Sequence, residues 1–96
     1  MSAQNPILDD VFVAFQVIPR LKEGNNFEVV DKAIEVVKAA DVPYQVGAME
    51  TTMKGELNYL LEVVKKAQQA CYDAGAVEVI TNIKIHSKTE AATDTF

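Results

Sequence analysis

The stretch Val42–Glu56, which separates two long amphipathic helical patterns, constrains the fold more than any other part of the sequence. Tyr44–Ala48 alternates as a strand does, and Glu50–Lys54 fits a second short strand. The connection between these two runs is tight, near Gly47–Met49. We therefore predict a hairpin of two strands in the middle of the chain, with one helix before it and one after it.

A strand and a helix are expected before this hairpin. Val11–Ile18 is rich in β-branched and aromatic residues, which is typical of a strand, and Pro19 is expected to end it by removing an amide donor. Asn25 stands three residues before Glu28, the spacing of a capping box, and predicts a helix that runs to about Ala40. The expected apolar stripe of this helix is Phe27, Val30, Ile34 and Val37, widened by Val29, Ala33, Val36 and Ala40.

A helix and a strand are expected after the hairpin. The second helix should start at Gly55 and end near Gly75, which can adopt a left-handed cap. Ala76–His86 alternates and predicts the last strand, whereas residues 1–9 and 87–96 are polar and should form a loose lead-in and a tail around a core of about 11–86. The residues of the second helix expected in the core are Leu57, Leu60, Leu61, Val64, Ala67 and Cys71.

The order of these elements is β-α-β-β-α-β, which predicts a ferredoxin-like α+β fold in a single domain over residues 1–96. Right-handed crossovers place both helices on one face of a four-stranded antiparallel sheet. The other face, called the open face below, would carry apolar side chains that need a cover. We therefore predict a homodimer or homotetramer that packs through its sheet faces. The expected residues of the open face are Phe12, Ala14, Gln16, Ile18, Ile80, Asn82 and Lys84.

Charge and composition exclude several classes of protein. The formal net charge of −5 argues against nucleic-acid binding, which depends on clustered Lys and Arg. No apolar run approaches the roughly 20 residues of a membrane span, and the first residues lack the pattern of a signal peptide. The single cysteine, Cys71, cannot form an internal disulfide. Together these features predict a cytoplasmic protein with no membrane contact.

Five polar residues are candidates for ligand binding. Gln16 and Asn82 would lie close together if the first and last strands are neighbours, and an amide offers both a donor and an acceptor. Glu50, Thr51 and Thr52 would sit at the end of the sheet. The alternative is structural: the two amides bond each other or a partner sheet, and the threonines simply favour a strand. Residue chemistry alone favours this alternative, because most polar side chains are satisfied locally.

The sequence gives little support to catalysis. His86 has no second histidine with which to share a metal, and Cys71 falls on the core stripe of a helix, so we expect a surface residue and a small buried apolar residue respectively. No phosphate loop, dinucleotide fingerprint or hydrolase motif occurs. We expect no metal, no cofactor and no enzyme activity.

From about Val11 to His86 the chain resembles the small thiamine-binding family of ferredoxin-like proteins. The resemblance is carried by V-V-D-K-A-I-E-V-V-K, P-Y-Q-V-G-A-M-E-T-T-M-K-G-E, A-Q-Q-A-C-Y-D-A-G-A and I-K-I-H. It implies a βαββαβ subunit that forms dimers and then tetramers through its sheets. It also implies a pocket for thiamine, or for its hydroxymethylpyrimidine portion, without catalysis.

Thr51 and Thr52 are assigned to this pocket by the motif, whereas Gln16, Glu50 and Asn82 are assigned from strand parity. Amide and hydroxyl groups would bind the aminopyrimidine edge, Glu50 would offset the positive thiazolium, and an oligomer interface would exclude water. The hypothesis is a non-catalytic protein that captures thiamine or a pyrimidine precursor reversibly. The alternatives are a homo-oligomeric scaffold or regulatory protein without a small ligand and, last, an enzyme of unknown reaction.

Overall fold

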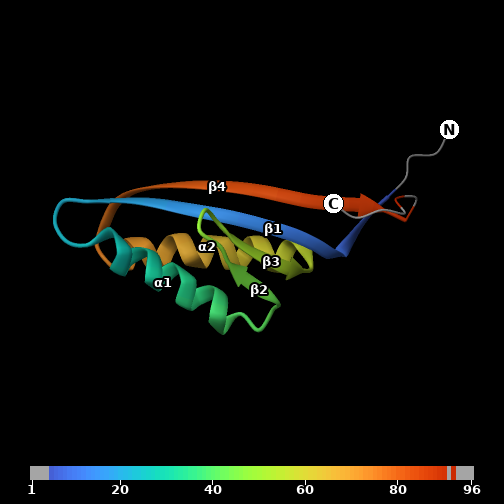
Figure 1. The fold of residues 1–96 in the computed structure, drawn as a ribbon, viewed down its shortest axis with the longest axis horizontal. Helices are drawn as coiled ribbons and strands as arrows, with labels where there is room; N and C mark the ends of the chain where they lie inside the picture. The colour runs from blue at the N-terminus through green and yellow to red at the C-terminus, as the bar shows by residue number, and fades with distance from the viewer. Residues whose placement is uncertain (1–4, 91, 93–96) are drawn as a thin grey trace.

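A computed structural model describes residues 5–90 and 92, which form six elements in the predicted order. The sheet has the strand order β2-β3-β1-β4, and every neighbouring pair is antiparallel. Figure 1 shows both helices on the same side of this sheet. The predicted ferredoxin-like α+β fold is therefore confirmed. The elements are β1 (Pro6–Leu21), α1 (Asn26–Ala39), β2 (Tyr44–Val46), β3 (Thr51–Gly55), α2 (Leu57–Asp73) and β4 (Ala76–Thr89).

The core lies between the sheet and the helices. Alternate residues of β1 point into it, and Met53 of β3 is fully buried beside them. The prediction that Phe27 joins the stripe of α1 is wrong: its side chain is 80% exposed, because it lies at the start of the helix and faces the β2–β3 turn. The other core residues are Val11, Val13, Phe15, Val17, Val29, Ala33, Val37, Leu60, Val63, Val64, Ala67, Cys71 and Ala76.

The two longest strands extend further than the sequence predicts. Pro19 does not end β1 but pairs with Val79 of β4. β3 pairs with β1 only as far as Phe15, so at Pro19 the strand has one neighbour and a missing amide need not cost a ladder hydrogen bond. At the other end Pro6 pairs with Thr89, so the parts of the expected lead-in and tail that fall there are strand. The rest of those two predictions lies mostly outside the described residues.

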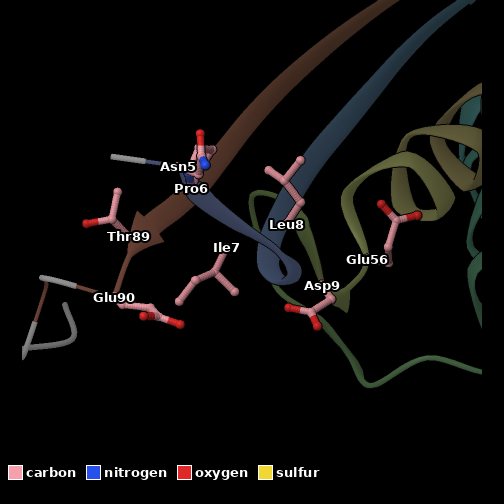
Figure 2. Close-up of a pocket in the computed structure, with 8 residues that line it drawn as sticks. All are labelled: Asn5, Pro6, Ile7, Leu8, Asp9, Glu56, Thr89 and Glu90. Atoms are coloured by element: carbon pink, nitrogen blue, oxygen red, sulfur yellow. The ribbon is translucent and has the colours of Figure 1, made fainter. Parts of the chain in front are cut away.

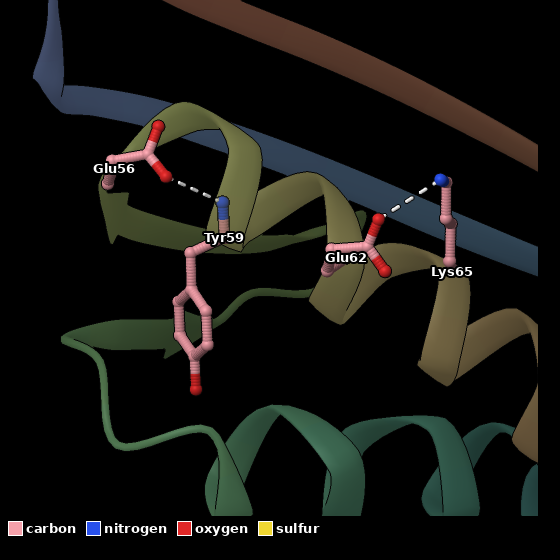
Figure 3. A network of polar contacts seen from close by, with 4 residues as sticks. All are labelled: Glu56, Tyr59, Glu62 and Lys65. Carbon is pink, nitrogen blue, oxygen red and sulfur yellow. Dashed lines mark hydrogen bonds and ion pairs between the residues drawn. The ribbon is translucent and has the colours of Figure 1, made fainter.

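Two side-chain caps define where the helices begin. Asn25 is the N-cap of α1, and its Oδ1 accepts a hydrogen bond from the Phe27 amide at 2.8 Å, whereas a capping box would use the amide of Glu28. Gly55 does not start α2, because it is the last residue of β3 and Glu56 is the cap. The Glu56 carboxylate accepts hydrogen bonds from the amides of Asn58 at 2.8 Å and Tyr59 at 3.0 Å, and Figure 3 shows the latter.

The turn between β2 and β3 is closed by the Gly47 amide, which donates to the Glu50 carbonyl at 2.9 Å. A Cβ atom at position 47 would stand only 2.9 Å from that oxygen, so the turn requires glycine there. Gly75, after α2, has a φ of +110° and gives the expected left-handed cap. These local constraints fix the direction in which the hairpin and β4 enter the sheet.

Candidate functional site

Strand pairing assigns the predicted polar residues to the two faces of the sheet. On the open face, Ala14 of β1 is flanked by Thr52 of β3 and Lys84 of β4. In the next row, Gln16 lies directly opposite Asn82. The larger apolar residues expected on this face, Phe12, Ile18 and Ile80, are exposed, with Ile80 at 54%, whereas Ala14 is only 9% exposed. The predicted composition of the open face is thus confirmed.

Gln16 and Asn82 contact each other, as strand order and parity predict. Asn82 Nδ2 donates a hydrogen bond to Gln16 Oε1 at 3.4 Å. This distance is at the long end for an amide hydrogen bond, and the contact is exposed to solvent. The pair is therefore weak, and a ligand could take over either amide at small cost.

An ion pair that the sequence does not predict spans the open face. Lys84 Nζ lies 2.9 Å from Glu50 Oε1, with 73% and 32% of the two side chains exposed. Because β1 lies between β3 and β4, this pair must cross β1. The small side chain of Ala14, which is opposite Lys84 and only 9% exposed, leaves room for the crossing.

The ion pair borders a hollow of about 580 Å³ beside the β2–β3 turn. This volume is within the roughly 300–1,000 Å³ of small-molecule sites. The lining combines a charge pair with two amides, a hydroxyl and the thioether of Met49, which is 76% exposed. Such a set can hydrogen-bond a polar ring and contact its faces. The lining residues are Gln16, Gln45, Gly47, Ala48, Met49, Glu50, Thr52 and Lys84.

Three of the five predicted site residues, Gln16, Glu50 and Thr52, line this hollow together. Asn82 joins them only through its contact with Gln16. Thr51 lies on the helix side of the sheet and is 6% exposed, because consecutive residues of a strand point to opposite faces. It lines an adjoining crevice of about 300 Å³ between α1 and the turn, which shares Gln16 and Glu50 with the hollow.

Gln45, Met49 and Lys84 are lining residues that the sequence analysis does not assign to the site. A parity signal exists for two of them, because Gln45 pairs with Thr52 and Lys84 with Ala14 on the open face. Lys54 is directed elsewhere: its Nζ lies 3.5 Å from Asp10 Oδ1 and 5.5 Å from the centroid of the Phe12 ring. It does not line the hollow.

A larger hollow, about 890 Å³, lies near the opposite end of β3 and contains none of the five predicted residues. It forms where β1 is irregular between Ile7 and Phe12, and Figure 2 shows its lining. The charged side chains there are carboxylates only, from Asp9, Glu56 and Glu90, and Glu56 is already engaged as the cap of α2. The smaller hollow therefore has the richer recognition chemistry.

The two residues considered for catalysis occupy structural positions. Cys71 is fully buried on α2, and this burial raises the pKa of its thiol. The His86 ring stacks on Phe12, with the centroids 6.0 Å apart and the planes within 7°. Across residues 5–90 and 92, no group of His, Cys, Asp and Glu side chains is placed to hold a metal ion. The helices in the same residues are too short or too polar to cross a membrane.

Comparisons with known proteins identify the family of this chain. Residues 13–95 match the family model described as thiamine-binding protein. A UPF0045 protein of Clostridium perfringens is 42% identical over 86 residues, which are 90% of each chain.

Two solved structures are similar as well. A domain of unknown function, DUF77, from Bacillus cereus is 56% identical with a TM-score of 0.83, over 90% of this chain and 83% of that chain. A Thermotoga maritima protein provisionally given as a thiamine biosynthesis/salvage protein is 28% identical with a TM-score of 0.72, over 80% and 82%. By its family match, its sequence relatives and its fold, this chain belongs to the thiamine-binding protein family.

Proposed function

We propose that the protein binds thiamine or a hydroxymethylpyrimidine-type precursor reversibly, without catalysis, in the hollow beside the β2–β3 turn. The observation that carries this proposal is the lining itself: Gln16, Glu50 and Thr52 converge on one hollow of about 580 Å³ in a chain of the thiamine-binding family. The hollow is large enough for such a ring system and offers both polar and thioether contacts.

The aminopyrimidine ring carries an amino donor and ring-nitrogen acceptors. The amides of Gln16 and Gln45 each supply one acceptor and two donors, and the Thr52 hydroxyl can act in either way. The exposed thioether of Met49 can lie against the face of the ring. These groups would select an aromatic ring with amino and ring-nitrogen groups over a purely apolar one.

The positive thiazolium of thiamine would lie near Glu50. In the structure this carboxylate is paired with Lys84 at 2.9 Å, so a cationic ligand would compete with the lysine for it. Once displaced, Lys84 could pair with a phosphate on the ligand, because its ammonium group is a mobile point charge on a long stem. Thiamine phosphates therefore belong among the ligands to test.

The hollow opens on a face that also exposes apolar side chains, Phe12 at 41%, Ile18 at 45% and Ile80 at 54%. A second subunit packed face to face would bury these side chains and exclude water from the ligand. We propose a homodimer or homotetramer of this kind, in which the ligand is enclosed between open faces.

Isothermal titration calorimetry and thermal shift assays with thiamine, its phosphates and hydroxymethylpyrimidine test the proposal. A ligand that binds only the folded state stabilises it by RT ln(1 + [L]/Kd), so the Tm should rise as the ligand concentration is increased. Thr52→Val removes a hydroxyl from the hollow and should weaken binding about 2- to 12-fold, the equivalent of one hydrogen bond. Thr51→Val, the matched change on the buried side, should weaken it less.

Glu50→Gln keeps the shape of the side chain and removes its charge. It should weaken binding of thiamine more than binding of the uncharged hydroxymethylpyrimidine, because only thiamine carries the thiazolium cation. Absence of any Tm shift with all of these compounds at millimolar concentration would refute the binding proposal.

A homo-oligomeric scaffold without a small ligand is the second candidate. It is favoured by the direct contact between Gln16 and Asn82, which shows that the two amides can satisfy each other. A scaffold predicts an oligomer whose size and Tm do not respond to any of the compounds above.

A further inference from the structure

β3 is shorter than β1 beside it, and the difference leaves part of β1 unpaired next to the turn. β3 begins at Thr51, opposite Phe15, whereas β1 continues to Leu21. Beyond Phe15 the side of β1 that faces away from β4 therefore has no paired strand among the described residues. Gln16 on the open face and Val17 on the helix side both lie in this stretch, and both line the crevice between α1 and the turn. The crevice thus passes the end of β3 from one face of the sheet to the other.

The crevice and the hollow share one wall. Both are lined by Gln16 and by residues 47–50 of the turn. Apart from these shared residues, the hollow is lined by polar side chains and the crevice, except for Thr51, by apolar ones. The two spaces therefore adjoin but differ in chemistry. At about 300 Å³ the crevice is at the small end of ligand sites, which suits one ring of a ligand rather than the whole molecule.

Three exposed apolar side chains line the crevice. Phe27 at the start of α1, Val46 at the end of β2 and Met49 in the turn are 80%, 46% and 76% exposed. They come from three different segments, so their exposed surfaces gather at one place. A single exposed apolar residue is ordinary, but a group of them around a concave surface is typical of a binding site.

A carboxylate gives this apolar space a preference for positive charge. Glu50 lines both spaces, and 32% of its side chain is exposed. Its ion-pair partner, Lys84, lines only the hollow, and none of the described residues that line the crevice is basic. The ring of Phe27 adds a second attraction, because a cation is stabilised over the face of an aromatic ring. A flat, positively charged ring fits this combination better than a neutral polar ring.

Local hydrogen bonds hold both walls of the crevice in place. The Phe27 amide donates to Asn25 Oδ1 at 2.8 Å, which fixes the start of α1. The Gly47 amide donates to the Glu50 carbonyl at 2.9 Å, which closes the turn. A ligand ring would therefore enter a space whose backbone is already ordered, and this lowers the entropic cost of binding.

We propose that the hollow and the crevice form one two-compartment site, in which the crevice takes the cationic ring of a two-ring ligand between Phe27 and Glu50. This inference rests on the function proposed above and names the class of ligand: a polar aromatic ring joined by a short linker to a positively charged ring. Thiamine has this form, whereas hydroxymethylpyrimidine fills the hollow alone. The crevice therefore makes the protein select two-ring ligands over their one-ring precursors.

Isothermal titration calorimetry of a Phe27→Ala variant with thiamine and with hydroxymethylpyrimidine tests the inference. The variant should bind thiamine about 2- to 30-fold more weakly, the equivalent of one cation–π contact, and hydroxymethylpyrimidine with less than about a 2-fold change. Because Phe27 is 80% exposed, its removal should not disturb the fold. Tyr72→Ala is the matched control: it removes an aromatic ring that is 40% exposed on α2, outside both spaces, and should change neither Kd.

A second variant tests the crevice by filling it. Val46→Phe adds a ring at a position that is 46% exposed, and it should weaken the binding of thiamine while that of hydroxymethylpyrimidine stays the same. Equal weakening of both compounds in either variant, or thiamine binding unchanged by either, would overturn the two-compartment site and leave the proposed function intact. A wild-type protein that binds neither compound would refute the proposed function itself, and this inference with it.

Discussion

Met53 gives the sharpest test of how the hairpin is held in the fold. Its side chain is fully buried in β3, opposite Val13 on one side and Tyr44 on the other. Met53→Ala removes three heavy atoms from this position and should lower the free energy of unfolding by about 2–5 kcal/mol. For a domain of this size each kcal/mol lowers the Tm by about 4–8 °C. Urea denaturation followed by circular dichroism measures the loss.

The same chain supplies a matched control. Met49 lies in the turn of the same hairpin and is 76% exposed, so Met49→Ala should change the free energy of unfolding by no more than about 0.5 kcal/mol. All variants are compared at one protein concentration, because self-association adds to apparent stability. The packing argument is wrong if the two substitutions cost the same, or if Met53→Ala costs less than about 1 kcal/mol.

Three further predictions concern single positions. Because burial raises the pKa of the Cys71 thiol, Ellman's reagent should react with it only at the rate of unfolding; rapid reaction of the native protein would contradict this. The unfolded thiol ionises first, so stability should fall as the pH rises above about 8.5. Glu56→Ala removes the cap of α2 and should lower the free energy of unfolding, measured by urea denaturation, by about 0.5–2 kcal/mol. An unchanged midpoint would show that the Glu56 cap does not stabilise the protein. Gly75→Ala forces a side chain into a φ of +110° and should lower the midpoint by about 1 kcal/mol or more, and a more stable variant would refute the strain.

The spacing of apolar residues along the sequence was enough to predict most of the fold. The alternation in Val11–Ile18 and the two helical stripes determine which face of the sheet is covered, and the paired residues agree with that assignment. The ends of the long strands were harder to predict. The pairing of Pro6 with Thr89 buries little side-chain surface, so it leaves no apolar pattern in the sequence. Phe27 was misassigned because a stripe gives the direction of a side chain but not the extent of the surface that covers it.

The positions of the candidate site residues could be predicted only where they follow from strand parity. Gln16 and Asn82 could be placed side by side from strand order alone. The ion pair between Glu50 and Lys84 could not, because it depends on how a long side chain crosses an intervening strand. Thr51 was grouped with its neighbours by motif, although adjacent residues of a strand belong to opposite faces.

The methyl group of Ala14 has a wider consequence for this architecture. Its two sequence neighbours, Val13 and Phe15, are core residues on the reverse side of the same strand. A larger or smaller side chain at position 14 would therefore raise or lower the Lys84 side chain that crosses it. The core residues on the other side of β1 would keep their packing contacts. Ligand preference in such a sheet can diverge through one substitution that leaves the folding core alone.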